Sequence, residues 1–334
     1  MKIAVISVTE QGDFIADKIK ETYATDSFSK NKAEGFDIKS ISKLCMENYS
    51  AVIYIASTGI AVRSIAPYIK SKAVDPAVIV IDCTGKYAIS LLSGHLGGAN
   101  KLTLEIAKSI GAMPIITTAS DNLGFLAPDV LAKENELEVG DLTKAKTIAA
   151  LLVAGKKVGF LDEDGKLNLP AGYETVKLNN YDDYEGLVYV TNKDKIDFSN
   201  IKMLKLIRKN IILGIGCKKN YDGEKMLKQV SEVLKEYNID KRAIKCISTV
   251  EVKRNEKAII NLSESLKCEL KIWGINEIKA VQHKYIGSDF VEKTIGVRAV
   301  CEPCAELSGG EFLSPKLNIE GMTLCIGKYK EELV

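Results

Sequence analysis

Short apolar runs alternate with amphipathic stretches through the first third of the chain. The runs are rich in Val and Ile, which is typical of strands covered on both faces of a sheet. The stretches between them repeat apolar residues every three or four positions, which predicts helices. This alternation favours a largely parallel sheet. The predicted strands are residues 2–8, 51–56, 77–83 and 113–119, and the predicted helices are residues 13–23, 60–69 and 99–110.

The rest of the chain divides into two further blocks. Residues 121–205 are acidic and carry several turn signals, which indicates a small middle α/β region over residues 126–208. Residues 209–334 again alternate strands with helices and predict a second α/β domain. We therefore expect an α/β protein with a parallel-sheet N-terminal domain over residues 1–125, followed by these two parts. The predicted strands in them include residues 158–161, 186–191, 244–250, 270–273 and 322–326, and the predicted helices are residues 144–153, 222–237 and 253–266.

Composition and charge narrow the class of protein. Of the 334 residues, 46% are hydrophobic and 27% are charged, as in ordinary soluble globular proteins. No apolar run is long enough to span a bilayer, and the first ten residues read as a core strand, so we expect a cytoplasmic protein. The net charge of +2 does not indicate nucleic-acid binding. Residues 121–200 carry a net charge of −6 and residues 201–260 one of +8, which indicates either a solvated surface or a local site for an anionic ligand.

The eight cysteines favour free thiols in a reducing compartment, because the chain is long and most of them stand among apolar neighbours. Cys301 and Cys304 have CxxC spacing. A structural zinc site usually needs two more ligands at matched spacing, and no second pair follows. Packing or a helix cap is therefore the favoured interpretation, and we predict no metal site.

The segment richest in candidate chemistry is SLLSGHLGGAN, residues 90–100. It predicts a strand, a glycine-rich loop and a helix. Backbone N–H groups of such a loop, together with the helix N-terminus, suit a carboxylate, a phosphate or a developing oxyanion. His95, one of two histidines in the chain, is a candidate general base. The alternative is a tight turn with a helix cap. The candidate binding residues of the loop are Ser93, Gly94, Gly97 and Gly98.

A second candidate segment directly follows the predicted strand 51–56. Ser57 and Thr58 offer hydroxyl groups, and Gly59 allows close backbone approach. Arg63, about one turn into the following helix, could hold a carboxylate. Ligands of open α/β sheets bind outside the carboxyl ends of strands, which favours a binding role. The alternative is that Ser57 and Thr58 only cap the helix.

Two more predicted strands end in polar residues. Asp82 ends one strand, and Thr117, Thr118 and Asp121 follow another. If the sheet is parallel, these residues should converge with the glycine loop and with residues 57–59 at one edge. No GxGxxG follows the first strand and no GxxxxGK[ST] occurs, so we disfavour a nicotinamide dehydrogenase and a P-loop ATPase.

The third block opens with another strand end that combines glycine and positive charge. Gly216, Cys217 and Lys218 precede a predicted helix and suit an anion. Glu251 follows the predicted strand 244–250 and is a candidate binding carboxylate, with a helix-start charge as the alternative.

At these segments the chain resembles the cobalt-precorrin-5A hydrolase family. The resemblance covers nearly the whole chain and is weakest over residues 11–50 and 122–205. One departure is VCEPCAEL, residues 300–307, where small apolar residues would be more usual. The matching stretches are STGIAVRSIAP (57–67), KAVDPAVIVID (72–82), SLLSGHLGGANKLTLEIAKSIGAMPIITTASD (90–121), the GIGC opening with its basic residues (214–219), STVEVK (248–253) and a serine-to-lysine region (288–316).

The resemblance implies a specific reaction in cobalamin biosynthesis. Water opens the δ-lactone of cobalt-precorrin-5A, a two-carbon unit leaves as acetaldehyde, and cobalt-precorrin-5B remains, so the enzyme would be a hydrolase acting on a carbon–carbon bond. His95 would be the base, and Gly97 and Gly98 would bind the oxyanion. Asp82 and Asp121 are the further catalytic candidates. The basic block 201–260 would face the carboxylates of the substrate.

The same resemblance implies no cofactor, because the substrate carries the cobalt. The expected partner is the corrinoid, with other corrin-pathway enzymes as further candidates and no nucleic acid or membrane. The oligomeric state is left open, a homodimer included. Two other functions remain as alternatives: a non-catalytic corrinoid-binding or channelling module, and a transferase that binds a phosphate ligand.

Overall fold

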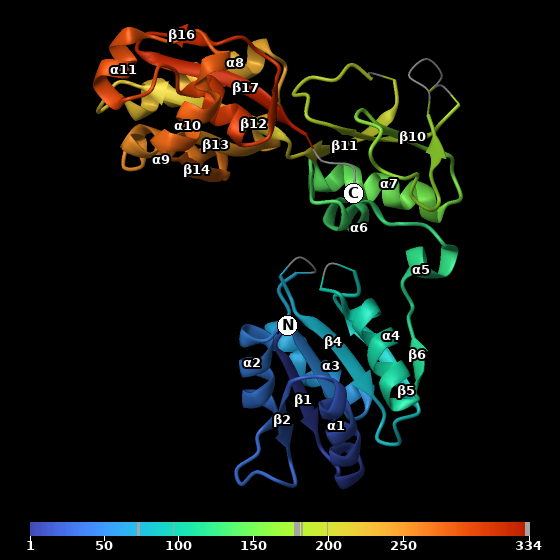
Figure 1. The fold of residues 1–334 in the computed structure, drawn as a ribbon. Helices are drawn as coiled ribbons and strands as arrows, with labels where there is room; N and C mark the ends of the chain where they lie inside the picture. The colour runs from blue at the N-terminus through green and yellow to red at the C-terminus, as the bar shows by residue number, and fades with distance from the viewer. Residues whose placement is uncertain (72–73, 96, 177–180, 182, 199, 331–334) are drawn as a thin grey trace. The chain divides into compact units, whose positions relative to one another are not determined.

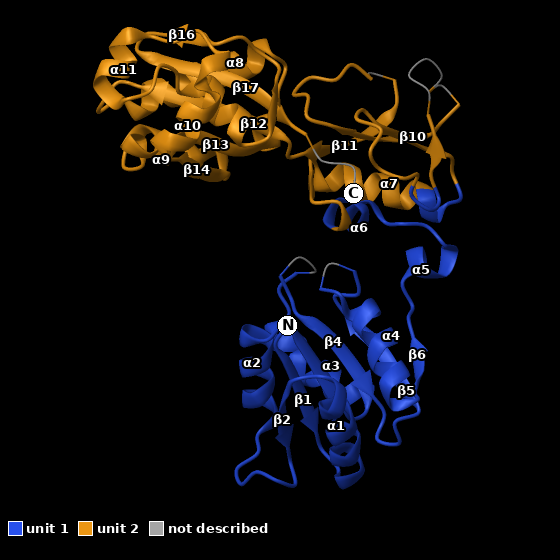
Figure 2. Cartoon of the chain, viewed as in Figure 1, with its two compact units in different colours: residues 1–133, 152–155, 170–172 blue, residues 134–151, 156–169, 173–334 orange. Residues whose placement is uncertain are grey.

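The computed structural model forms two compact units (Figure 2). Unit 1 consists of residues 1–133, 152–155 and 170–172, and unit 2 of residues 134–151, 156–169 and 173–334. None of the described helices is both long and apolar enough to cross a membrane. The structure describes residues 1–71, 74–95, 97–176, 181, 183–198 and 200–330.

A six-stranded sheet forms the centre of unit 1 (Figure 1). Its elements are β1 (Ile3–Ser7), α1 (Glu10–Thr22), β2 (Thr25–Ser29), α2 (Ile38–Asn48), β3 (Ala51–Ile55), α3 (Thr58–Ile65), β4 (Ala77–Ile81), β5 (Tyr87–Leu92), α4 (Ala99–Ile110) and β6 (Met113–Ile115). The strand order is β2-β1-β3-β4-β5-β6. The predicted strands 2–8, 51–56 and 77–83 and the three predicted helices of this part are confirmed, whereas the strand predicted over residues 113–119 ends at Ile115 and a helix begins at Ala119. The edge strand β2 and the helix α2 were not predicted.

Alternate residues of the central strands face two separate cores. On β1, Ile3 and Val5 pack with residues of α1 and α4, whereas Ala4 and Ile6 pack with residues of α2 and α3. Full burial of an Ile or Val side chain contributes about 1.5–3 kcal/mol. Because helices cover both faces, the strands are continuous apolar runs, as the sequence indicated.

Two strands of this sheet, β5 and β6, run opposite to the other four. β5 runs antiparallel to β4, whereas β4 is parallel to β3, and β6 is parallel to β5. A tight turn joins β4 to β5, and Gly85 in it has φ +71°, a conformation that favours glycine. The carboxyl ends of β5 and β6 therefore lie at the edge where β3 and β4 begin. The prediction that all these strand ends converge is wrong, and the candidate residues fall into two groups.

A smaller sheet lies in the middle segment. After α5 (Ala119–Leu123) and α6 (Pro128–Glu134) come β7 (Leu137–Val139), α7 (Leu142–Val153), β8 (Val158–Asp162), β9 (Glu174–Thr175), β10 (Gly186–Thr191) and β11 (Lys202–Arg208). The strand order is β7-β11-β10-β8-β9, and only β7 pairs antiparallel. α7 packs against β10 at Gly186, where an added Cβ would lie 2.7 Å from a methyl group of Leu151.

A third sheet completes unit 2. Its elements are β12 (Ile211–Cys217), α8 (Gly223–Glu236), β13 (Ile244–Val250), α9 (Lys257–Leu266), β14 (Glu269–Trp273), α10 (Ile275–Val281), α11 (Asp289–Ile295), α12 (Cys301–Leu307), β15 (Gly310–Phe312), β16 (Leu317–Ile319) and β17 (Met322–Tyr329). The order is β14-β13-β12-β17-β15, with β16 paired to β17. β12, β13 and β14 are parallel, and β17 is antiparallel to β12.

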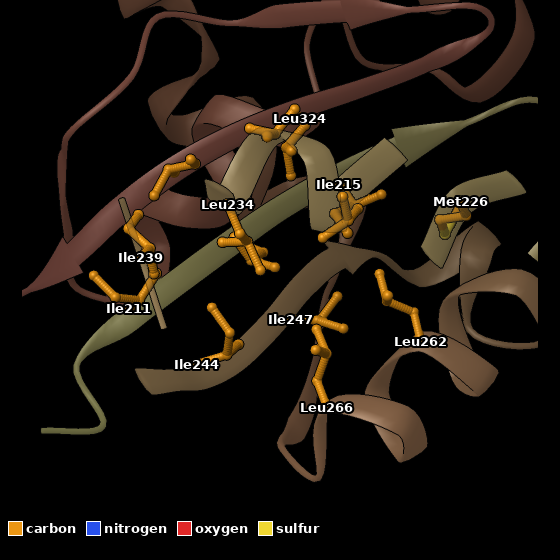
Figure 3. Packing of buried hydrophobic residues seen from close by; sticks show 14 of the residues in the cluster. Ile211, Ile215, Met226, Leu234, Ile239, Ile244, Ile247, Leu262, Leu266 and Leu324 are labelled. Carbon is orange, nitrogen blue, oxygen red and sulfur yellow. The ribbon is translucent and has the colours of Figure 1, made fainter. Parts of the chain in front are cut away.

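The two faces of this third sheet are covered by different helices. Ile211, Leu213 and Ile215 of β12 pack with α8 and α9 in the core that Figure 3 shows in part. On the other face, Ile212 packs with Cys301 and other residues of α12. Burial raises the pKa of both the Cys301 and Cys304 thiols, so they stay protonated at neutral pH. The CxxC pair therefore serves packing.

Replacing Gly214 with alanine should destabilise this sheet by about 1–3 kcal/mol, because α12 packs directly on β12 at that residue. An added Cβ would lie 1.9 Å from the carbonyl oxygen of Cys301 and 2.8 Å from its carbon. Urea unfolding would measure the loss. Gly223→Ala is the matched control, since its Cβ would meet no atom closer than 3.6 Å. Equal midpoints for the two variants would contradict this account.

Acid should weaken unit 2 through Asp240, whose side chain is almost fully buried. Burial alone would raise its pKa, but hydrogen bonds from Arg242 (2.8 Å) and Lys205 (2.7 Å) outweigh burial and lower the pKa to about 2. This carboxylate contributes roughly 2 kcal/mol above pH ~4, and the contribution disappears as the pH falls toward 2. Asp240→Asn should have a lower free energy of unfolding than the unaltered chain at pH 7. Between pH 4 and pH 2 its free energy of unfolding should fall less than that of the unaltered chain. Parallel curves in pH-dependent urea unfolding would rule this out.

Candidate active site

The loop after β5 is folded tightly upon itself. Ser93 has φ +59° and Gly98 has φ +84°. A Cβ on Gly97 would lie 2.4 Å from the Cβ of Ser93, and a Cβ on Gly94 would lie 2.6 Å from Oδ1 of Asn100. The glycines are therefore required for packing within the loop, whatever ligand it binds.

His95 in this loop is held by two residues at the start of α5. Its Nε2 lies 3.0 Å from Oδ2 of Asp121 and 3.0 Å from Oγ of Ser120. The side chain of His95 is 21% exposed and that of Asp121 is 40% exposed, so solvent and ligands can reach the pair. Both partners contact the same ring nitrogen. The arrangement is therefore not a Ser–His–Asp triad, in which serine and aspartate contact opposite nitrogens.

Asn100 connects the parts of this site. Its Nδ2 donates to Thr118 Oγ1 (2.9 Å) and to Asp121 Oδ2 (2.9 Å), and its Oδ1 accepts from Ser90 Oγ (2.6 Å). Asn100 is 6% exposed, and its backbone N–H donates to the carbonyl of Gly94 (2.9 Å). One buried amide thus links β5, the glycine loop and α5. Sequence reasoning missed Asn100, although it stands directly after the glycine loop.

This geometry allows His95 to accept a proton from a ligand. When Nε2–H donates to the Asp121 carboxylate, Nδ1 carries the lone pair and is the basic atom. The two predicted oxyanion donors, Gly97 and Gly98, differ in whether their N–H groups already donate a hydrogen bond. The N–H of Gly98 already donates to the His95 carbonyl (3.0 Å), so the structure does not support Gly98 in that role. Among the described residues, the N–H of Gly97 has no hydrogen-bond acceptor, and it stays the candidate donor.

Five predicted site residues lie at the opposite edge of the sheet, because β5 is reversed. Ser57, Thr58 and Gly59 follow β3, and Arg63 lies on α3 with its guanidinium 3.3 Å from where a Cβ of Gly59 would be. Ser57 makes no side-chain cap bond, so helix capping does not account for it. Asp82 accepts from the N–H groups of Thr84 (3.0 Å) and Tyr87 (2.6 Å). Asp82 thus stabilises the β4–β5 turn and is not part of the His95 cluster.

The charge state of Asp82 follows from these contacts. Burial alone would raise its pKa, but hydrogen bonds from Thr84 and Tyr87 outweigh burial and lower the pKa. Asp82 is therefore ionised at neutral pH. At the His95 edge, Thr118 accepts from Asn100, whereas Thr117 is exposed beside it.

Unit 2 contains a pocket of about 780 Å³ at the carboxyl end of β12. Gly216, Cys217 and Lys218 line it, and their predicted role in binding an anion stays a prediction. Burial raises the pKa of Cys217 to about 11, so its thiol stays protonated at neutral pH and is a poor nucleophile. Glu251 is not in the lining; its carboxylate accepts from the N–H of Ile275 (3.1 Å) at the start of α10. Glu251 therefore lies outside this pocket, and its binding role stays a prediction.

Sequence reasoning missed most of the pocket's charged residues. Lys253 and Glu256 lie just after β13, and Arg298 and Lys316 lie in loops far along the chain. Only the fold brings these four together. Among the described residues, no cluster of three or more His, Cys, Asp or Glu side chains could hold a metal ion.

The fold and these two sites define an α/β protein with a histidine–carboxylate cluster in unit 1 and a cationic pocket in unit 2. Three family models match consecutive parts of the chain. They are Cobalamin synthesis G N-terminal at residues 40–121, the Cobalamin biosynthesis central region at residues 126–206 and Cobalamin synthesis G C-terminus at residues 211–327. The chain is thus a protein of cobalamin biosynthesis.

Curated relatives narrow this class. The chain is 32% identical to the cobalt-precorrin-5A hydrolase of Salmonella typhimurium (strain LT2) over 97% of both chains. It is 28% identical to the cobalt-precorrin-5A hydrolase of Priestia megaterium over 92% of this chain and 89% of the relative. The chain belongs to the cobalt-precorrin-5A hydrolase family, as its sequence motifs indicated, and the names of these relatives support a hydrolytic enzyme.

Proposed function

We propose that the chain hydrolyses the δ-lactone of cobalt-precorrin-5A and releases acetaldehyde, which leaves cobalt-precorrin-5B. The observation that carries the proposal is the 3.0 Å contact between His95 in the glycine-rich loop and Asp121 on α5. A histidine with one ring nitrogen bound by a carboxylate has its other nitrogen available as a base. The names of the relatives supply the substrate.

The first stage opens the lactone. His95 accepts a proton from water as its oxygen bonds to the lactone carbonyl carbon. The N–H of Gly97 donates to the oxyanion in this scheme. The bond between the carbonyl carbon and the ring oxygen then breaks. A carboxylic acid results, and the released alkoxide takes the proton from His95.

The second stage breaks a carbon–carbon bond. The new alcohol loses its proton to His95, its oxygen forms a carbonyl, and the bond between that carbon and the macrocycle breaks. The electron pair of the broken bond enters the conjugated ring, and acetaldehyde leaves. One water is consumed for each acetaldehyde released. The cobalt arrives within the substrate, so the scheme needs no cofactor from the protein.

The test is acetaldehyde release from cobalt-precorrin-5A under anaerobic conditions, with purified protein and no added cofactor. We expect catalytic release, with one acetaldehyde for each corrinoid opened. Tight corrinoid binding without release would replace the proposal by a carrier or channelling role. Stabilisation by nucleotides or phosphosugars, with no corrinoid binding, would favour a transferase instead.

A further inference from the structure

The pocket of unit 2 is built entirely from the third sheet and its connections. The loop after β12 forms one side, and the 3₁₀ turn at Glu251–Lys253 with residues 255–256 forms a second. α11, residues 298–300, Lys316 and the hairpin between β16 and β17 form the rest. Its volume of about 780 Å³ lies in the range of sites that enclose a sizeable organic ligand.

Cations in this pocket outnumber the carboxylates available to them. The two lining carboxylates are already paired: Glu256 with Lys253 (3.4 Å), and Glu320 with Lys225 (2.5 Å), which lies outside the lining. Three further lining lysines have no carboxylate at ion-pair distance within the described part of the chain. They are Lys218, Lys219 and Lys316. A ligand with several anionic groups would supply partners for these three lysines.

The pocket also presents an apolar surface. Phe290 on α11 is 76% exposed, and Val252 is 50% exposed. Ile319, from the opposite hairpin, is half-buried. Large apolar side chains grouped around a cavity indicate a binding surface, because each loses contact with water when a ligand covers it. An apolar surface with cationic groups beside it suits a ligand that has an apolar centre and carboxylate side chains.

The loop that bears the lysines is held in place before any ligand binds. The Glu256 carboxylate, only 9% exposed, accepts from the N–H groups of Asn220 (3.2 Å) and Tyr221 (3.0 Å). On the other side, the N–H of Lys218 donates to the carbonyl of Gly321 (3.0 Å). Preorganisation of this kind lowers the entropy cost of binding.

We propose that this pocket is a corrinoid-binding site. The apolar face of the macrocycle packs on Phe290 and Val252, and its carboxylate arms pair with Lys218, Lys219 and Lys316. The choice of ligand rests on the proposed function. His95, the candidate base, belongs to the other unit, so we assign binding and no chemical step to this pocket.

Absorbance titration of the full chain tests this proposal. The probe is cobyrinic acid, a stable cobalt corrinoid with free carboxylate arms, and its fully methylated ester is the neutral comparison. We expect the acid to bind at least tenfold more tightly than the ester, with affinity that falls as salt is added. The double variant Lys218→Glu/Lys316→Glu should lose at least tenfold in affinity for the acid and much less for the ester. Phe290→Ala should weaken both ligands about tenfold.

Two controls separate this proposal from the proposed function. Lys228→Glu makes one charge reversal on α8, outside the pocket lining, and should bind as the unaltered chain does. Acetaldehyde release is measured on the same proteins. Charge-dependent binding without any release would overturn the hydrolase and leave the pocket assignment. Release with affinities unchanged in every pocket variant would overturn the pocket assignment alone.

Discussion

Replacing His95 with glutamine should lower the rate of acetaldehyde release about 10²–10⁴-fold, which is the usual contribution of a positioned general base. Glutamine keeps a polar group near Asp121 and Ser120 but cannot accept a proton at neutral pH. Corrinoid affinity should change little, since the loss concerns the chemical steps. Single-turnover measurements at saturating substrate would separate the rate from binding.

His283→Gln is the matched control for this variant. His283, the second histidine, is exposed in the 3₁₀ turn Gln282–Lys284 of unit 2 and should be replaceable without effect on the rate. Asp121→Asn should lower the rate of acetaldehyde release by an amount between those of the two histidine variants. The asparagine amide no longer fixes which ring nitrogen of His95 carries the proton. A loss of no more than tenfold in His95→Gln would remove His95 from the base role.

Local pattern predicted most of the longer strands and helices of the three sheets, but not β2, β7, β9, β11, β15 or β16. β3 and β4 are continuous apolar runs because helices cover both faces of their sheet. The exceptions have physical reasons. β2 (TDSFS) is a partly exposed edge strand with few apolar residues, so its sequence resembles a loop. Direction could not be predicted either, because the reversal of β5 depends on a short turn whose strands look like their parallel neighbours.

The candidate sites were predictable only where one segment carried the signal. His95 and the glycine loop stand together in the sequence, as do Gly216 and Lys218. Asn100 could not be recognised, because its importance comes from contacts with Ser90, Thr118 and Asp121 that are up to 21 residues away. Long-range contacts likewise assemble the pocket of unit 2, where Lys316 lies in the loop between β15 and β16, far along the chain from the GIGC segment. Polar residues at strand ends indicated candidate sites, but they did not indicate at which edge of the sheet each strand would end.

Replacing Arg208 with methionine should destabilise unit 2 by about 3–5 kcal/mol, the cost of leaving a buried charge without its partner. Arg208 and Asp162 are both almost fully buried, with side chains 8% and 3% exposed. Nη2 of Arg208 lies 2.8 Å from both carboxylate oxygens of Asp162, and its Nε lies 3.5 Å from Asp164. Asp164 in turn binds Lys328 of β17 (2.5 Å), so the network joins the middle sheet to the third sheet.

Lys209→Met provides the matched control, because Lys209 pairs with Glu138 (3.0 Å) on the surface, where both side chains are about 40% exposed. Exposed pairs contribute about 0–1 kcal/mol, so this variant should unfold almost as the unaltered chain does. Asp162→Asn combined with Arg208→Met should recover part of the loss, because neither charge then remains buried alone. Urea unfolding followed by fluorescence would give the four midpoints. If Arg208→Met and Lys209→Met unfolded alike, the link between the two sheets would rest on apolar packing, and the buried ion pair would contribute little to it.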